Sequence, residues 1–418
     1  MEYDLIDFRG IAIGILAFVF VLFIGLWLLK KHHLNTRAIF YIALLACLGH
    51  FIGAFFYYYY SIKIGSDSVM YFQHAYANDG LFGYSFAISI LEVLRKYIVD
   101  NSLLGAFFIF GSIGFLGSIY YALTLKILLD RIAGLETRYL LNIGQLNWPM
   151  TLLMCWPSYL FWSSGLVKDS FSFTSIAIIL YTLVNPQLKI SNIIIFFVAC
   201  TLGFFVRPYL FLIFITTAFI YLLLNSKQSL FVKIIMTLLL IYISSVLLPL
   251  VLHFSGISQL STSAAAKYAI RQQAYMSIGT SISVPTHNPK LLILFLPYLI
   301  IANLFLPLFI KAHNFIAIVS SIENTYLVWL VTNFIRNKII WNELTQKIRI
   351  LKFLLLYFLV GISFLGLIST NLGLAMREKI MYVPALLMII MLVTSYKKVL
   401  MIKSYLSNEL GDPSTCAA

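Results

Sequence analysis

The sequence predicts an all-α protein, a polytopic bundle of membrane-spanning helices. Of its 418 residues, 61% are hydrophobic and only 11% are charged, whereas soluble globular domains carry roughly 25% charged residues. Apolar runs such as Ile11–Leu29, Leu104–Leu125 and Ile234–Leu252 approach or exceed the roughly 17–25 residues that cross a bilayer as a helix. Strand-like alternation is absent from the sequence, and a segment in lipid must satisfy its backbone hydrogen bonds internally. A helical bundle is therefore the expected architecture.

The formal net charge of +14 does not indicate a nucleic-acid-binding protein. The basic residues cluster at the ends of apolar runs, as membrane topology requires, and no basic stripe is interleaved with exposed aromatic residues. The cysteines show neither metal-ligand spacing nor a disulfide framework. They are Cys47, Cys155, Cys200 and Cys416. We therefore expect no nucleic-acid partner, and we expect the cysteines to be small buried hydrophobic side chains.

The first apolar run, Ile11–Leu29, is predicted to be a permanent span rather than a signal peptide. Acidic residues precede it, whereas Lys30-Lys31 and Arg37 follow it. This polarity is opposite to that of a secretory signal and places the N-terminus outside. Following the chain from a cytoplasmic Lys30–Arg37 segment predicts about eleven spans and a cytoplasmic C-terminus.

The remaining spans follow from the apolar runs and from the charges between them. They are predicted at Ala38–Tyr58, Leu104–Leu125, Leu140–Phe161, Phe171–Val184, Ser191–Val206, Tyr209–Leu224, Ile234–Leu252 and Phe315–Phe334, with two more before the C-terminal tail. The run Leu291–Ile310 is predicted to be a re-entrant or interfacial element, because a further crossing there would place the basic Arg336–Lys352 segment outside. Its two prolines, Pro297 and Pro307, interrupt helical hydrogen bonding.

We expect a single polytopic domain over residues 1–407, followed by a short polar tail at 408–418. The predicted outer loops are 59–103 and 253–290. In this topology the rare polar clusters at the segment ends all lie on the same, non-cytoplasmic side. They comprise Asp67, Lys168, Asp169, Arg207, Arg271 and Arg377. Ionisable groups gathered at one membrane face usually mark a functional site.

Asp67 and the Lys168-Asp169 pair each have a structural and a functional interpretation. Ser66 or Asp67 is a suitable N-cap for a short helix, but the Asp67 carboxylate could also accept a proton or hold a divalent metal. Lys168 and Asp169 either pair with each other or cap the helix from Ser170. Alternatively, Asp169 orients Lys168 toward a phosphate.

The arginines are likewise open to two interpretations. Arg207 either snorkels from a helix end toward water or grips a phosphate with its planar guanidinium. Arg377, beside Glu378 and Lys379, either lies in a solvated loop or also binds a phosphate. Arg271 is a third candidate for phosphate binding.

Glu323 lies well inside an apolar run and has no residue of opposite sign nearby on its helix. Because a buried carboxylate needs partners, we expect Glu323 to meet a basic residue of the bundle in a structural role. Tyr71 and Trp162 stand beside the polar clusters and are candidates for a structural role or for a contact with an acceptor.

Four short elements share a pattern with one family of membrane enzymes. They are the Asp-Ser-x-x-Tyr element at Asp67–Tyr71, the Pro-Ser…Ser-Ser-Gly…Lys-Asp stretch at Pro157–Asp169, the hydrophobic-Arg-Pro element at Gly203–Pro208, and Arg377 ahead of Tyr382-Val383-Pro384. Together they resemble the GT-C superfamily of polyprenyl-linked glycosyltransferases. In outline the chain is also similar to O-antigen and capsule repeat-unit polymerases, which share a large late outer loop and functional arginines.

The resemblance implies a GT-C-like glycosyltransferase at the extracytoplasmic face of a bacterial inner membrane. The donor would be a polyprenyl-phosphate-linked sugar, and the acceptor a glycan or a lipid-linked glycan. Asp67 would accept the acceptor's proton, while Lys168, Arg207 and Arg377 would stabilise the departing phosphate. The resemblance implies no certain cofactor, and it leaves open whether the enzyme uses a divalent metal.

Three rival hypotheses stay open at the level of sequence. The first is a repeat-unit polymerase, which would rely on arginines around a pyrophosphate. The second is a transporter of lipid-linked sugars, although such proteins usually place polar groups near the bilayer midplane and often carry internal repeats. The third is a non-catalytic partner of a glycan-assembly machine.

Overall fold

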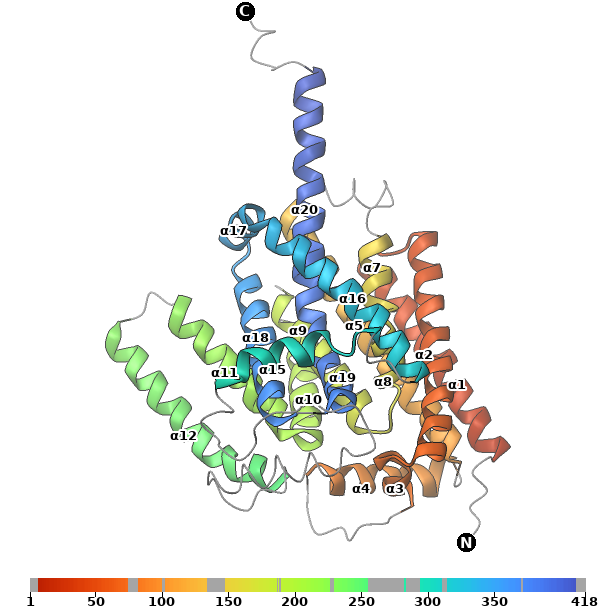
Figure 1. The fold of residues 1–418 in the computed structure, drawn as a ribbon. Helices are drawn as coiled ribbons and strands as arrows, with labels where there is room; N and C mark the ends of the chain where they lie inside the picture. Colours follow the sequence, from red (N-terminus) through yellow and green to blue (C-terminus); the bar gives the residue numbers. More distant parts are fainter. Residues whose placement is uncertain are drawn as a thin grey trace, which may run out of the picture.

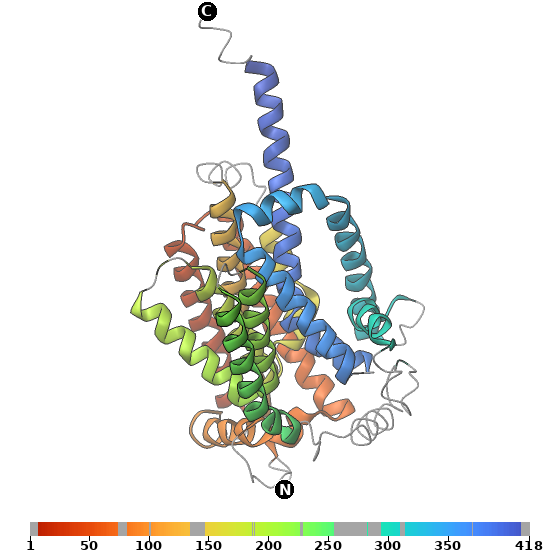
Figure 2. The ribbon, with the colours of Figure 1, turned by 90° about the vertical axis from the view of Figure 1, so that its left-hand side faces the viewer.

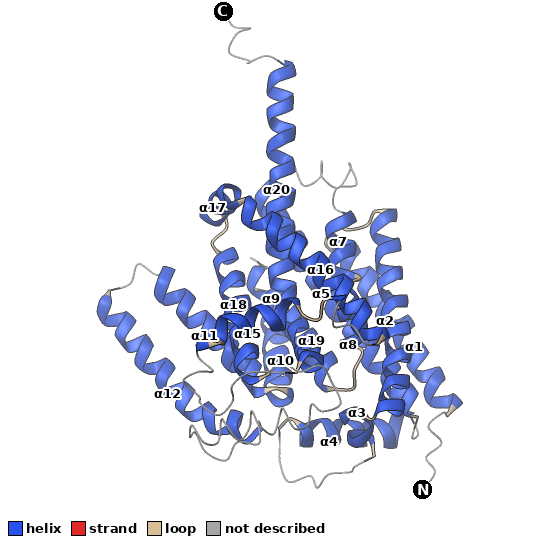
Figure 3. Cartoon of the chain, in the orientation of Figure 1, coloured by secondary structure: helices blue, strands red, loops and turns tan. Residues whose placement is uncertain are grey.

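The structure is a computed structural model that describes residues 7–73, 82–99, 102–133, 147–185, 187, 189–225, 229–254, 282, 294–309, 314–369 and 371–410. Within these ranges every regular element is a helix (Figure 3). The prediction of an all-helical protein is therefore confirmed for this part of the chain.

Seven of the described helices are long and apolar enough to cross a membrane. They are α1 (Phe8–Lys31), α2 (Arg37–Ile64), α5 (Leu103–Ala133), α11 (Pro208–Asn225), α16 (Phe315–Arg336), α18 (Ile350–Ile368) and α20 (Val383–Leu410). Other apolar helices are α10 (Ile190–Val206), α12 (Leu230–Phe254) and α15 (Leu296–Phe305). Seven such helices agree with a multi-pass membrane protein, whereas the count of about eleven spans stays a prediction.

The remaining elements are mostly shorter. They are α3 (Asp67–Phe72), α4 (Tyr84–Leu94), the π-helix η1 (Arg95–Val99), α7 (Asn147–Met154), α8 (Pro157–Trp162), α9 (Lys168–Val184), α17 (Lys338–Lys347), α19 (Leu372–Glu378) and the 3₁₀ turn η3 (Lys379–Met381). Figure 1 shows α3 and α4 lying across the lower end of the bundle, whereas α17 lies near its upper end.

Helix α5 is the centre of the N-terminal half, where it packs against α1, α2 and α9. Its contact with α1 requires glycine, because a Cβ at Gly105 would lie 2.4 Å from the carbonyl oxygen of Gly10. Close backbone approach of this kind increases the packing contacts between helices that have no water to expel between them. The contact of α5 with α9 sets the first residues of α9 deep inside the molecule, where Lys168 and Asp169 are buried.

Basic residues gather at the upper end of the bundle. Helix α1 begins at the lower end in Figure 1, and α20 ends at the upper end, beyond the rest of the bundle in Figure 2. Basic residues stand where described helices reach the upper end, such as Lys31 of α1, Arg37 of α2 and Arg336 of α16. This distribution is the one that the positive-inside rule associates with a cytoplasmic upper end. The orientation itself stays a prediction.

One predicted span was wrong in its described part. Leu140–Phe161 was expected to form one helix, but from residue 147 onward the chain forms α7 and then α8, interrupted after Met154. Pro157 opens α8, because its missing N–H and fixed φ suit the first position of a helix and prevent α7 from continuing through it.

The element predicted at Leu291–Ile310 contains the ten-residue helix α15. At about 1.5 Å per residue it is roughly 15 Å long, about half of the hydrocarbon thickness of a bilayer. A re-entrant or interfacial element, which need not cross the bilayer, agrees with this length.

Candidate functional site

The polar clusters meet where four chain segments converge near the lower end of the bundle. Asp67 begins α3, Lys168 and Asp169 begin α9, Arg207 ends α10, and Arg377 lies in the last turn of α19. These segments are far apart in the sequence. The structure therefore brings together five of the six residues singled out above. Arg271 lies outside the described residues.

Local sequence explains why two of these segments turn at this point. Arg207 precedes Pro208, whose ring disfavours the helical conformation of the residue before it. Arg207 accordingly leaves α10 with φ −146° and ψ 85°. Val167 adopts a φ of 50° immediately before α9, which is a strained conformation for a β-branched residue. Backbone strain of this kind is concentrated at functional sites.

The carboxylate of Asp169 is the centre of the site. Nη2 of Arg207 donates to its Oδ1 at 2.6 Å, and Nε of Arg377 donates to its Oδ2 at 2.7 Å. The hydroxyl of Tyr57 lies 3.5 Å from the same Oδ2. Asp169 is 0% exposed. Asp169 therefore bridges two arginines, an arrangement that neither sequence-based alternative for this residue included.

Arg207 is held by a second acid on its other side. Its Nη1 donates to the hydroxyl of Tyr209 at 2.8 Å and lies 3.3 Å from Oε1 of Glu378. The Tyr209 hydroxyl donates to the same Glu378 oxygen at 3.0 Å. Arg207 is only 4% exposed, so the alternative that it snorkels toward water is wrong. Two carboxylates compensate the charge of this buried guanidinium.

Arg377 links the buried part of the cluster to its surface. In addition to its bond with Asp169, it donates through Nη1 to Oδ2 of Asp67 at 3.4 Å. The side chain of Arg377 is 14% exposed and that of Asp67 is 45% exposed. The alternative of a solvated loop is therefore wrong for Arg377. Ser66 is the N-cap residue of α3 but makes no capping hydrogen bond through its side chain, and Asp67 lies in the first turn.

Lys168 is buried beside this cluster and packs on aromatic rings. Its Nζ lies 3.3 Å from the ring centroid of Tyr84 and 5.2 Å from that of Tyr71. Tyr71 is buried and stands at 74° to the Tyr84 ring. Burial, together with the positive charges of Arg207 and Arg377, lowers the pKa of Lys168 to about 7. The charge of Lys168 is therefore predicted to change near neutral pH.

This lowered pKa predicts a dependence of stability on pH. Between about pH 7 and the ordinary lysine pKa of 10.5, the unfolded chain holds one proton more than the folded chain at this position. The free energy of unfolding therefore rises with pH across that window. We expect the thermal midpoint of the detergent-purified wild type to rise from pH 7 to pH 10. The midpoint of Lys168→Met should rise less over the same range. The exposed Lys63→Met variant should keep the wild-type slope, and an equal slope in Lys168→Met would contradict the expectation.

A polar cavity of about 500 Å³ opens beside Asp67 and Arg377. Trp162 contributes to its wall, as do Asn314 and Asn371. Asp169 and Arg207 do not line this cavity but lie behind Arg377, which Asp169 orients. The cavity therefore presents one carboxylate and one guanidinium to a ligand.

An apolar groove of about 490 Å³ adjoins the polar cavity. The two share Tyr60, Ile64, Trp162 and Ile316 in their walls. The groove lies between α2, α8 and α16 and includes the exposed side chains of Ile52, Phe56 and Phe315. Exposed apolar side chains on candidate membrane spans are expected to contact lipid tails. The polar cavity and the apolar groove therefore share a wall.

Glu323 lines the inner side of this groove. Its carboxylate accepts hydrogen bonds from the indole Nε1 of Trp156, at 2.5 Å, and from the backbone N–H of Ser158, at 2.8 Å. The Ser158 hydroxyl donates to it as well. The expected basic residue is Lys379, whose charge acts on Glu323, although the direct hydrogen-bond donors to Glu323 are neutral groups at the start of α8. The prediction of a structural role stays consistent with this arrangement. The nearby buried Lys379 donates instead to Oδ1 of Asn324.

Three members of the cluster were not singled out from the sequence: Glu378, Tyr209 and Tyr57. Glu378 follows Arg377 in the sequence, and Tyr209 follows the Arg207-Pro208 pair. Their closeness to these candidate residues could have identified them as members of the site. Tyr57 belongs to an aromatic run, Phe55–Tyr60, that is typical of a membrane interface. Within the described ranges no group of three His, Cys, Asp or Glu side chains is arranged to hold a metal ion.

The fold defines the class of the chain, a multi-pass helical membrane protein. No protein-family model, curated protein or solved structure matches it.

Proposed function

We propose that the protein is an integral membrane glycosyltransferase that uses a polyprenyl-phosphate-linked sugar. The observation that carries this proposal is that the cavity at Arg377 and Asp67 shares a wall with the apolar groove between α2 and α16. A donor of this class has an anionic phosphate and sugar at one end and a hydrocarbon chain at the other. The polar cavity suits the first part, and the groove suits the second.

In the proposed reaction the acceptor hydroxyl attacks the anomeric carbon of the donor sugar. The new bond joins the acceptor oxygen to that carbon, and the bond from the carbon to the phosphate oxygen breaks. Asp67, which is partly exposed to the cavity, takes the acceptor's proton. Arg377 stabilises the negative charge that develops on the departing phosphate.

The buried members of the cluster act in this proposal through Arg377. Asp169 binds Nε of Arg377 and directs the remaining nitrogens toward Asp67 and the cavity. Arg207 binds Asp169 from the opposite side and is itself held by Glu378. Because Asp169 and Arg207 are buried, little reorganisation of these two groups is needed when charge develops on the substrate. Lys168 supplies a further positive charge behind the site when it is protonated.

The setting of the reaction is part of the same proposal. The resemblance to the GT-C superfamily and the basic residues at the upper end favour about eleven crossings in a bacterial inner membrane. The site would then face the extracytoplasmic side, where cell-envelope polysaccharide or glycolipid is assembled. The N-terminus would lie outside and the C-terminus in the cytoplasm.

The proposal is tested by the glycans of a bacterial strain from which the gene has been deleted. The strain is complemented with wild type, Asp67→Asn or Arg207→Ala, and its glycans are profiled by gel and mass spectrometry. We expect glycans that lack one sugar in the deletion strain and in both variants. Single repeat units left on the lipid carrier would indicate a polymerase instead. An unchanged profile would sink the proposal and favour a transporter or a non-catalytic partner.

A further inference from the structure

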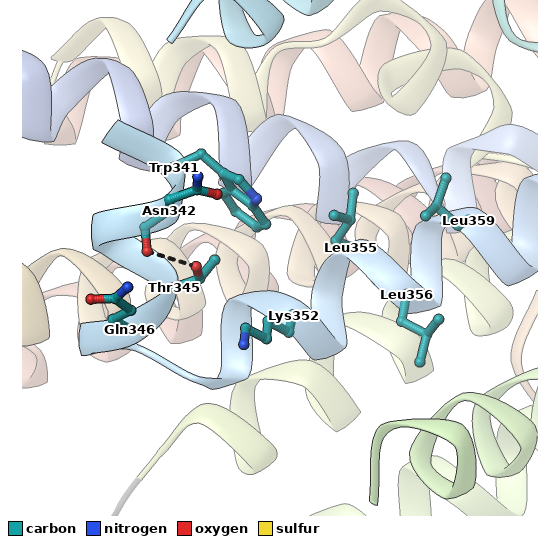
Figure 4. A pocket seen from close by; sticks show the side chains of 8 residues that line it. All are labelled: Trp341, Asn342, Thr345, Gln346, Lys352, Leu355, Leu356 and Leu359. Atoms are coloured by element: carbon teal, nitrogen blue, oxygen red, sulfur yellow. Dashed lines mark hydrogen bonds between the residues drawn. The ribbon is translucent and has the colours of Figure 1, made fainter. Parts of the chain in front are cut away.

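A second cavity, of about 430 Å³, lies near the upper end of the molecule between α17 and α18 (Figure 4). Helix α17 contributes polar side chains to it, namely Asn342, Thr345 and Gln346. Helix α18 contributes Leu355, Leu356 and Leu359. Figure 4 shows Lys352 between these two groups, and Trp341 completes the wall. The cavity is therefore polar on one side and apolar on the other.

The cavity changes from polar to apolar in the same direction as a bilayer does from its surface to its hydrocarbon core. Helix α18 is a candidate span that begins at Ile350, so Lys352 lies in its first turn. Leu359 is seven residues further along α18, or about 10 Å deeper at 1.5 Å per residue. Leu359 is also exposed, as expected for a residue that faces lipid tails. The polar side of the cavity thus lies near the membrane surface, and its apolar side extends toward the hydrocarbon.

The charge around the cavity is positive. The segment 336–352 contains five basic residues and one acidic residue. The one acid, Glu343, is bound to Lys347 and to the hydroxyl of Tyr396. Among the lining residues Lys352 is the charged one, and no acidic side chain lines the cavity. A ligand with a negative group at the level of Lys352 therefore meets no opposing carboxylate there.

We propose that this cavity binds one phospholipid with an anionic headgroup. Lys352 pairs with the phosphate, and the side-chain amides of Asn342 and Gln346 donate to headgroup oxygens. The upper part of one acyl chain lies along Leu355, Leu356 and Leu359. Trp341 stands at the boundary between headgroup and hydrocarbon, where tryptophan is enriched. The volume falls within the roughly 300–1,000 Å³ of ordinary small-molecule sites.

The test is native mass spectrometry of the full-length, delipidated protein titrated with phosphatidylglycerol or phosphatidylcholine. We expect phosphatidylglycerol to bind with the higher affinity. Lys352→Ala should weaken that binding about fivefold, the contribution of one lysine near an anionic surface. Leu356→Trp, which fills the apolar side, should weaken the binding of both lipids. The matched control is Lys338→Ala, an exposed lysine of α17 that does not line the cavity.

Three results would overturn this proposal. Equal weakening by Lys352→Ala and Lys338→Ala would show diffuse attraction to a basic surface. Unchanged binding in Leu356→Trp would show that no acyl chain enters the cavity. Full competition by soluble glycerol 1-phosphate would show a site for a free anion. None of these results depends on the proposed glycosyl transfer, because the cavity is separate from Asp67 and Arg377.

Discussion

Asp169→Asn is expected to destabilise the protein by about 3–5 kcal/mol, the cost of removing one partner from a buried ion pair. Asp169 is fully buried and binds both Arg207 and Arg377. Without its charge, Arg207 keeps only Glu378 as an acidic partner, and Arg377 keeps only the more distant Asp67. A neutral amide of the same size leaves the packing unchanged, so the loss would report the missing charge.

The effect is measured as the fall in the thermal midpoint of the detergent-purified protein. The matched control is Glu343→Gln, which removes an acid from the exposed pair with Lys347 near the other end of the bundle. Exposed pairs contribute little to stability, so this control should stay close to wild type. If the two variants fell by the same amount, the Asp169 bridge would not be a principal source of stability.

Arg377→Ala is expected to lower the rate of sugar transfer by about 10²–10³, the usual cost of removing one group that stabilises charge in a transition state. Arg377 is the guanidinium that lines the polar cavity and also contacts Asp67. Arg377→Lys keeps a positive charge but cannot bind two carboxylates through separate nitrogens of a planar group. We expect its activity to lie between those of wild type and Arg377→Ala.

The rate is followed as glycan formed per amount of folded protein in the membrane, because Arg377→Ala also removes a partner of Asp169. Lys96→Ala serves as the control, since Lys96 is an exposed basic residue of η1 outside the cavity. Full activity of Arg377→Ala, at wild-type protein levels, would rule out Arg377 as the group that stabilises the phosphate.

The fold was predictable where it depends on local composition. Long apolar runs predicted the first residues of α1, α2, α5 and α11 to within three residues, because lipid admits few alternatives to a helix. Helices α2 and α5 extend six and eight residues beyond their predicted ends. The break between α7 and α8 was missed, although Pro157 was visible. A proline near the end of an apolar run can either kink or end a helix, and the choice depends on packing around it.

The candidate site was predictable only as a set of positions. Asp67, Asp169 and Arg377 could be assigned to one end of the bundle because charge is confined to the ends of spans. Their partners could not be assigned. Asp169 was expected to pair with its neighbour Lys168, to orient it toward a phosphate, or to cap the following helix. In the structure it binds two arginines that lie 38 and 208 residues away in the sequence.

The sequence by itself determined the helical membrane class, most of the described spans and the end of the bundle at which the polar residues gather. Hydrophobicity and charge act on each segment separately, so they can be read without knowing its neighbours. Only the tertiary structure decided which charges compensate each other and that the polar cavity lies beside an apolar groove. Glu323 illustrates the difference, because its donors come from α8, more than 160 residues earlier in the chain. Such pairings depend on how helices pack, which no single segment encodes.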